Sequence, residues 1–73
     1  MRNIFETIYD YLKINGAASP YEICLLFWDK PTIVDFCKIY IVIDLMIEDG
    51  NIKEIKSSNG LCLYDIMRLS LIH

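Results

Sequence analysis

The sequence has little of the chemistry from which active sites and metal centres are built. Its 73 residues include one histidine, the terminal His73, and three cysteines with no Cys-X-X-Cys pair among them. Metal sites need closely spaced ligand pairs, and catalysis needs a nucleophile beside a base, a carboxylate pair in a cleft or a metal. We therefore predict no catalytic residue, no metal site and no cofactor, and we expect the protein not to be an enzyme.

The cysteines are too few and too scattered for a disulfide framework. The number of cysteines is odd, and they lie at Cys24, Cys37 and Cys62. Cysteine is commonly buried as a small apolar residue, and thiols stay reduced inside cells. We expect three buried thiols in a cytoplasmic protein, and the sequence leaves one disulfide open as the alternative.

Positive charge is also scarce. Seven lysines and arginines stand against ten acids, which gives a formal net charge of −3. Nucleic-acid binders usually carry a basic face, because phosphate contacts supply much of their affinity. The balance opposes strong non-specific binding to DNA or RNA, and it leaves room for a local basic patch.

Long uninterrupted apolar runs are missing as well. The best membrane candidate, residues 33–47, is shorter than the roughly 20 residues that a span needs. Asp35, Lys38 and Asp44 interrupt this run. The amino terminus carries acids where a signal peptide has its apolar core. We expect a soluble protein without membrane contacts.

Apolar residues as a class are abundant, at 55% of the chain. Soluble domains usually contain about 45–50%, and a domain this small buries only about 60% of its unfolded surface. The surplus predicts a homodimer or a protein partner that covers apolar surface. The length allows one domain, residues 1–73.

Capping signals and apolar periodicity predict three helices. The first covers residues 3–14, with Asn3 as its cap and with Tyr11 and Lys13 pointing outward. The second begins at Ser19 and Pro20 and ends near residue 27 or 28. The third begins at Thr32 and continues to about residue 49, where Gly50 stops it.

The third helix organises the chain. Its inward face is predicted from helical spacing to consist of Phe36, Ile39, Ile43 and Met46. Residues 38–45 are rich in isoleucine, valine and tyrosine, and in isolation they also suit a strand. The capping signal, the length and the stop at Gly50 favour the helix, and the strand is the alternative.

A hairpin is predicted after Gly50. Residues 52–56 and 61–64 are the expected strands, and the Asn-Gly pair within residues 57–60 favours a primed turn. Asp65 is predicted to cap a short last helix over residues 65–73. That helix would turn Ile66, Leu69 and Ile72 inward and Arg68 to solvent.

The order of these elements resembles the winged helix-turn-helix family. Residues 16–23 (GAASPYEI) are similar to the family's entry to its second helix. A second set is similar to the family's V-x3-L-x2-L-x3-G-x-I pattern: Ile39, Ile43, Met46, Gly50 and Ile52. The resemblance implies an α+β, mostly α fold, in which three helices precede a two-stranded β-hairpin wing and a short C-terminal helix.

The resemblance also implies a dimeric transcription-regulator-type protein that binds DNA through the third helix and the wing. The corresponding residues are Lys38 and Tyr40 on the helix and Lys53, Lys56, Ser57, Ser58 and Asn59 on the wing. Four acids against one lysine on the third helix oppose this role, since duplex DNA repels acids.

The alternative function is a protein-interaction module that does not bind DNA. Such a protein would be an adaptor, or an inhibitor encoded by a virus or plasmid. Its interface would be the apolar outer side of the third helix, with Tyr40, Ile41, Val42 and Leu45 as anchors. Aromatic and aliphatic side chains in a packed centre commonly dominate the energy of such interfaces.

Overall fold

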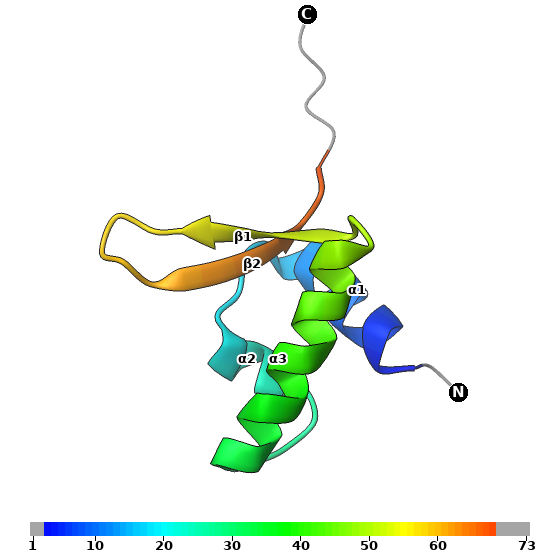
Figure 1. Cartoon of the computed structure of the whole chain (residues 1–73), viewed down its shortest axis with the longest axis vertical. Helices are drawn as coiled ribbons and strands as arrows, with labels where there is room; N and C mark the ends of the chain where they lie inside the picture. The colour runs from blue at the N-terminus through cyan, green and yellow to red at the C-terminus, as the bar shows by residue number, and fades with distance from the viewer. Residues whose placement is uncertain (1–2, 69–73) are drawn as a thin grey trace, which may run out of the picture.

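The computed structural model describes residues 3–68, and it contains three helices followed by a two-stranded antiparallel hairpin (Figure 1). The elements are α1 Ile4–Asn15, α2 Pro20–Cys24, α3 Ile33–Glu48, β1 Ile52–Lys56 and β2 Cys62–Ile66. The α+β class and the order of these elements agree with the expectation from the sequence.

Polar side chains start each helix where the sequence predicts. The Asn3 side chain accepts a hydrogen bond from the Glu6 backbone N–H at 2.9 Å. Ser19 with Glu22, and Thr32 with Asp35, form complete capping boxes at α2 and α3. These bonds satisfy backbone N–H groups that have no partner within the helix, which fixes the three starting points.

The second helix is shorter than predicted. It ends at Cys24, and residues 25–27 form a turn rather than further α-helix. The backbone N–H groups of Leu26 and Phe27 donate to carbonyls three residues earlier, at 3.1 and 3.0 Å. The backbone is therefore wound more tightly after Cys24 than in an α-helix. The Trp28 ring packs beside the Phe27 ring, with centroids 5.8 Å apart.

Residues 38–45 are helical, so the strand alternative is wrong. Ile39, Ile43 and Met46 are buried on the inner side of α3, as predicted, and Phe36 is half-buried against them. Helical spacing places these four side chains on one side. The capped helix therefore overrides the strand propensity of its isoleucines and valines.

The core gathers apolar side chains from every element. On α1, Ile8 and Leu12 are fully buried, and Ile52 of β1 and Tyr64 of β2 are nearly so. Tyr11, predicted to point outward, packs partly against this core instead. Tyr11 follows the buried Ile8 by three residues, which places it at the margin of the same side of the helix.

The hairpin turn differs from the predicted primed type. Such a turn needs positive φ at both central residues. Among residues 3–68 only glycines have positive φ, so Asn59 does not, whereas Gly60 has φ +85°. The Gly60 N–H donates to the Ser57 carbonyl at 3.0 Å, and Ser57 N–H donates to the Leu61 carbonyl at 2.9 Å. A longer loop of residues 57–61 therefore joins the strands.

The predicted helix starting at Asp65 is wrong. Asp65 and Ile66 belong to β2, where they pair with Lys53 and Ile52 of β1. Antiparallel pairing with the whole of β1 extends β2 beyond residue 64, and this pairing prevails over the capping potential of an aspartate. The rest of that prediction, Leu69 and Ile72 included, lies outside the described residues.

A short connection between α1 and α2 joins the edge of the hairpin. Ala18 and Tyr64 exchange backbone hydrogen bonds of 2.9 and 2.8 Å. Ala18 is buried, with 1% of its surface exposed. This bridge was not predicted, since one alanine between two helices has no strand periodicity, and it ties β2 to the helical part of the fold.

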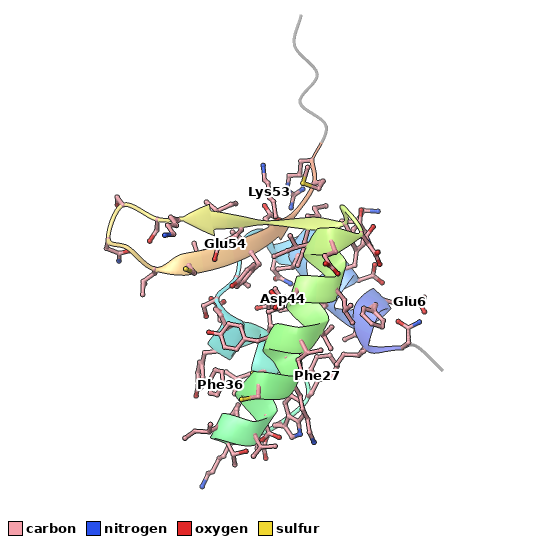
Figure 2. All side chains as sticks on the ribbon, in the orientation of Figure 1. Glu6, Phe27, Phe36, Asp44, Lys53 and Glu54 are labelled. Carbon is pink, nitrogen blue, oxygen red and sulfur yellow. The ribbon has the colours of Figure 1, made fainter. Side chains whose placement is uncertain are left out.

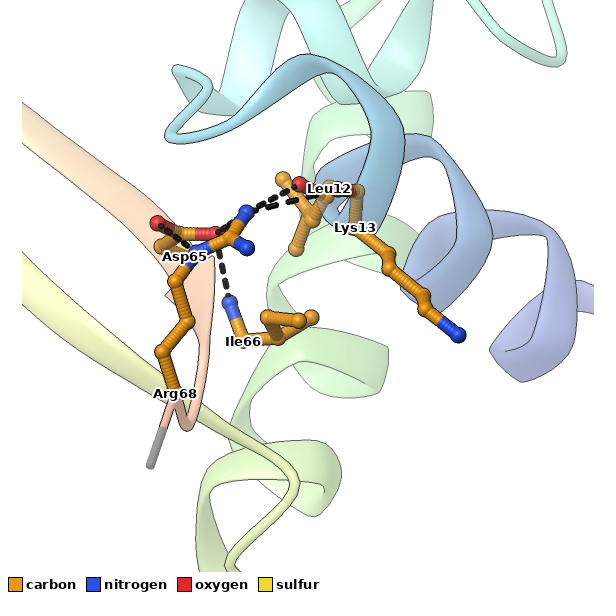
Figure 3. A network of polar contacts seen from close by, with 5 residues as sticks. All are labelled: Leu12, Lys13, Asp65, Ile66 and Arg68. Carbon is orange, nitrogen blue, oxygen red and sulfur yellow. Dashed lines mark hydrogen bonds and ion pairs between the residues drawn. The ribbon is translucent and has the colours of Figure 1, made fainter. Parts of the chain in front are cut away.

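Asp65 and Arg68 fasten the end of β2 to the end of α1 (Figure 3). The Arg68 Nε lies 3.2 Å from Asp65 Oδ2, and a terminal guanidinium nitrogen donates to the Leu12 carbonyl at 3.1 Å. Asp65 Oδ1 also accepts from the Ile66 N–H at 2.7 Å. Arg68 is exposed, as predicted, with 48% of its side chain in solvent, and its guanidinium also caps the last turn of α1.

Figure 1 shows the hairpin lying across the C-terminal end of α3, with its loop extending away from the helices. The short α2 lies beside α3, below the hairpin in that view. Within residues 3–68, no helix combines the length and the apolarity needed to cross a bilayer.

Candidate interaction surface

The solvent side of α3 carries a stripe of apolar residues. Val34, Cys37, Ile41 and Leu45 follow spacings of three, four and four residues, which places them on one side of the helix. Val34, Ile41 and Leu45 are 61%, 62% and 44% exposed, and Cys37 is also exposed. We call these four residues the outer face of α3.

Two more exposed apolar residues widen this surface toward α2. Ile33 is 81% exposed and Tyr40 is 44% exposed. Tyr40 follows Phe36 by one turn, and the Phe36 ring stacks on Tyr21 of α2 with centroids 6.3 Å apart. The predicted interface residues Tyr40, Ile41 and Leu45 therefore do lie on one continuous surface. The predicted set of interface residues did not include Ile33, Val34 and Cys37. Counting back from Ile41 in steps of three or four residues reaches all three positions.

Val42 does not belong to the exposed surface, which corrects its assignment as an interface anchor. The side chain is half-buried and packs against the core. Each residue turns an α-helix by about 100°. That rotation carries Val42 away from Ile41 and toward Ile39 and Met46, which lie one turn before and after it.

The hairpin places its two lysines on opposite faces. Successive side chains of a strand alternate between faces, so Lys53 and Lys56, three residues apart, point to opposite sides of the sheet. In Figure 2 the Lys53 side chain rises from the face away from α3, whereas Glu54 lies on the face turned toward α3. The two lysines predicted to contact DNA together are thus separated by the sheet.

The hairpin loop uses two of its three predicted DNA contacts for its own structure. The Ser57 hydroxyl donates to Asn59 Oδ1 and accepts from the Leu61 N–H at 3.2 Å. The third, Ser58, is exposed at the tip beside Asn59. Ser57 and Asn59 are therefore explained by the turn, which is their usual role in such loops.

Acidic residues gather where the hairpin faces α3. Asp44 on α3 and Glu54 on β1 both lie near the buried Tyr64, and both side chains are exposed (Figure 2). The pKa of Tyr64 is raised to about 12, chiefly by desolvation and then, in decreasing order of effect, by the nearby Glu54, Tyr40, Cys62 and Asp44. Negative charge therefore borders the outer face of α3 on its hairpin side. Lys38, the remaining predicted site residue of the helix, is exposed on the opposite border of that face.

The three cysteines are unpaired, and they differ in exposure. Only Cys24 is buried, Cys62 is half-buried and Cys37 is exposed, so the expectation of three buried thiols is wrong. Burial raises the pKa of the Cys24 thiol. A hydrogen bond with Glu54 raises the pKa of the Cys62 thiol. Both shifts favour the less reactive thiol form.

A separate open cavity of about 310 Å³ lies between α1 and the C-terminal end of α3. Its lining consists of Phe5, Glu6, Tyr9, Asp10, Met46 and Asn51. Glu6 and Asp10 already take part in polar or electrostatic interactions. Across residues 3–68, no three histidine, cysteine, aspartate or glutamate side chains are grouped so that they could hold a metal ion.

Comparison with known proteins adds no relative from which a role could be transferred. No protein-family model, no curated protein and no solved structure matches this chain. The functional argument therefore depends on the surfaces of the molecule itself.

Proposed function

We propose that this protein is a protein-interaction module, an adaptor or inhibitor, that binds its partner through the outer face of α3. The observation that carries the proposal is the contiguous exposure of Val34, Ile41 and Leu45 along one side of a capped helix. Exposed apolar patches of this kind are typical of interaction sites, because leaving them in water costs free energy.

The distribution of charge supports a protein partner over DNA. A DNA-reading helix presents arginine, lysine or amide side chains to base edges. The exposed side of α3 instead presents Ile41 and Leu45, with Asp44 beside them. Burying apolar side chains in a protein interface stabilises the complex, because these side chains leave water. Contact with DNA phosphates gives them no comparable stabilisation.

We also propose that the scaffold of this protein is a winged helix. Three helices followed by a two-stranded hairpin support the winged-helix resemblance. Winged-helix scaffolds serve as DNA readers and as protein-binding modules, so the scaffold alone does not decide between them.

The proposal is tested by site-specific photocrosslinking in the cells that produce the protein. A photoreactive residue in place of Ile41 is expected to give one discrete adduct with a partner protein. The same residue in place of Lys53, on the far face of the hairpin, is the matched control and is expected to give none. Leu45→Glu should remove the adduct at position 41. Equal labelling at both positions, or none at position 41, would overturn the proposal.

A second candidate is the dimeric DNA-binding regulator that the resemblance implies. The exposed Lys38, Lys56 and Ser58 favour it. In a gel shift at low salt, the double variant Lys53→Glu with Lys56→Glu should then lose DNA retention while the dimer stays intact. Retention that is unchanged by both substitutions would remove the hairpin from any DNA site.

A further inference from the structure

The charges around the outer face of α3 indicate what kind of partner it accepts, an inference that rests on the proposed function. The face is bordered on the hairpin side by Asp44, and Glu54 lies across from it on β1. Glu48 ends the face at the last turn of the helix. Against these three acids the face has one exposed cation, Lys38, on the opposite border.

Neither lysine of β1 lies between Glu54 and the outer face of α3. Lys53 lies on the face of the hairpin away from α3, as Figure 2 shows. Lys56 shares the face of Glu54 but lies at the loop end of β1, opposite Cys62 in the strand register. The border nearest to Ile41 therefore keeps its negative charge.

The spacing of the apolar residues suits a helix as the partner. The outer face runs from Val34 to Leu45, which at 1.5 Å per residue is about 16 Å, or three helical turns. Residues at intervals of three and four present ridges into which the side chains of a second helix pack. A partner helix of about three to four turns covers the whole face.

A second copy of this chain fits the face less well. In an antiparallel pair centred on Ile41, the twofold axis brings each border of the face against the same border of the other copy. Asp44 then lies about 9 Å along the axis from Asp44 of the other copy, within the roughly 10 Å over which charges interact at 0.1 M salt. Lys38 meets Lys38 in the same way, and each chain carries a net charge of −3.

We propose that the outer face of α3 binds an amphipathic helical segment of another protein, and that this segment carries lysine or arginine on the border that turns toward Asp44 and Glu54. Apolar side chains of the segment pack between Val34, Ile41 and Leu45. Its basic side chains lie over the two carboxylates. Charge complementarity of this kind selects the partner and sets its orientation.

Two designed helical peptides test the inference. Both have the same leucine stripe at three- and four-residue spacing, and one has lysine where the other has glutamate on both borders. Binding of each fluorescently labelled peptide to the full chain is measured by anisotropy at low and high salt. We expect the lysine peptide to bind at least about tenfold more tightly at low salt, with the preference shrinking at high salt.

Variants of the chain assign the preference to particular charges. Asp44→Lys with Glu54→Lys should reverse it. Lys53→Glu, which also changes hairpin charge but on the far face, should change it by no more than about twofold. Ile41→Glu should abolish binding of both peptides.

The outcomes separate this inference from the proposed function. Equal binding of both peptides that Ile41→Glu abolishes would overturn the charge inference and leave the interaction surface standing. Binding that is insensitive to Ile41→Glu, or no binding of either peptide, would overturn the helical partner. A preference that Asp44→Lys with Glu54→Lys does not alter would also overturn the assignment of the border.

Discussion

Ile41 and Ile43 show how much two residues of one type can differ in solvent exposure within a single helical turn. Ile41 is 62% exposed and Ile43 is fully buried. Composition does not separate them, because both are isoleucines in an apolar run. The 200° rotation over two residues of an α-helix separates them completely, and it places Ile41 on the solvent side and Ile43 in the core.

This difference predicts a large contrast in stability. Ile43→Ala removes packed methylene groups from the core and should lower the free energy of unfolding by about 2–5 kcal/mol. Ile41→Ala, its matched control, should change it by less than about 0.5 kcal/mol. Chemical denaturation of both variants measures the two values. Similar losses for both would place Ile41 in the core and invalidate the outer face.

Tyr64 predicts how stability depends on alkaline pH. Its pKa is raised from 10.0 to about 12, chiefly by burial and then by nearby Glu54. The unfolded chain loses this proton near pH 10, whereas the folded chain keeps it to about pH 12. Stability should therefore fall between these values, by at most about 2–3 kcal/mol from this group.

The measurement is thermal unfolding at a series of pH values from 8 to 12, a range chosen around the ordinary tyrosine pKa of about 10. Tyr64→Phe should flatten the decline above pH 10. Tyr21→Phe, at an exposed position, serves as the control and should leave the decline in place. The same slope in all three proteins would show that Tyr64 does not govern it.

At the scale of elements, the end of α1 depends on a residue far away in sequence. The Leu12 carbonyl accepts from the Gly16 N–H at 2.8 Å and from Arg68 at 3.1 Å (Figure 3). Asp65, which is 9% exposed, holds the same guanidinium. A positive group at the C-terminus of a helix also interacts favourably with the helix dipole. Arg68 thus joins the last strand to the first helix.

Arg68→Met should lower the free energy of unfolding by about 1 kcal/mol, because it leaves the Asp65 carboxylate without its ion-pair partner. The guanidinium is 48% exposed, so water screens part of the loss and keeps the effect modest. Lys13→Met removes another cation from the last turn of α1 and should cost less. Urea titration of the two variants compares them, and a smaller loss for Arg68→Met than for Lys13→Met would contradict this role.

At the scale of the whole molecule, the hairpin determines which charges lie beside α3. One face presents Lys53, and the other presents Glu54 toward α3 and Lys56 at the loop end of β1. The sides on which Lys53 and Glu54 lie follow from strand alternation and from the docking of β1 on the end of α3, because neither residue has a local feature that fixes its side. This arrangement leaves the outer face of α3 apolar and bordered by acids, which is the basis of the proposed preference for a basic protein segment over DNA.

We expect the isolated protein to have the mass of one chain in light scattering over a wide concentration range. Like charges on matching borders and a net charge of −3 oppose pairing of two outer faces. A stable dimer that Ile41→Glu dissociates would assign the face to a second copy. A dimer that survives Ile41→Glu would use a different surface.

The sequence by itself determined the elements that depend on local chemistry. Ser19, Thr32 and Asn3 cap their helices because their oxygen atoms reach N–H groups three residues ahead. Burial of Ile39, Ile43 and Met46 was predictable from helical spacing. So was the exposure of Ile41 and Leu45, because the same spacing that defines an inner side defines an outer one.

Only the tertiary structure decided what depends on distant neighbours. Pairing with β1 kept Asp65 and Ile66 in a strand, and contact with the core drew in Tyr11 and Val42. The docking of the hairpin placed both Glu54 and Asp44 near Tyr64 and turned Lys53 away. Capping and periodicity act over a few residues, whereas these outcomes depend on which segments far apart in the chain come to lie side by side.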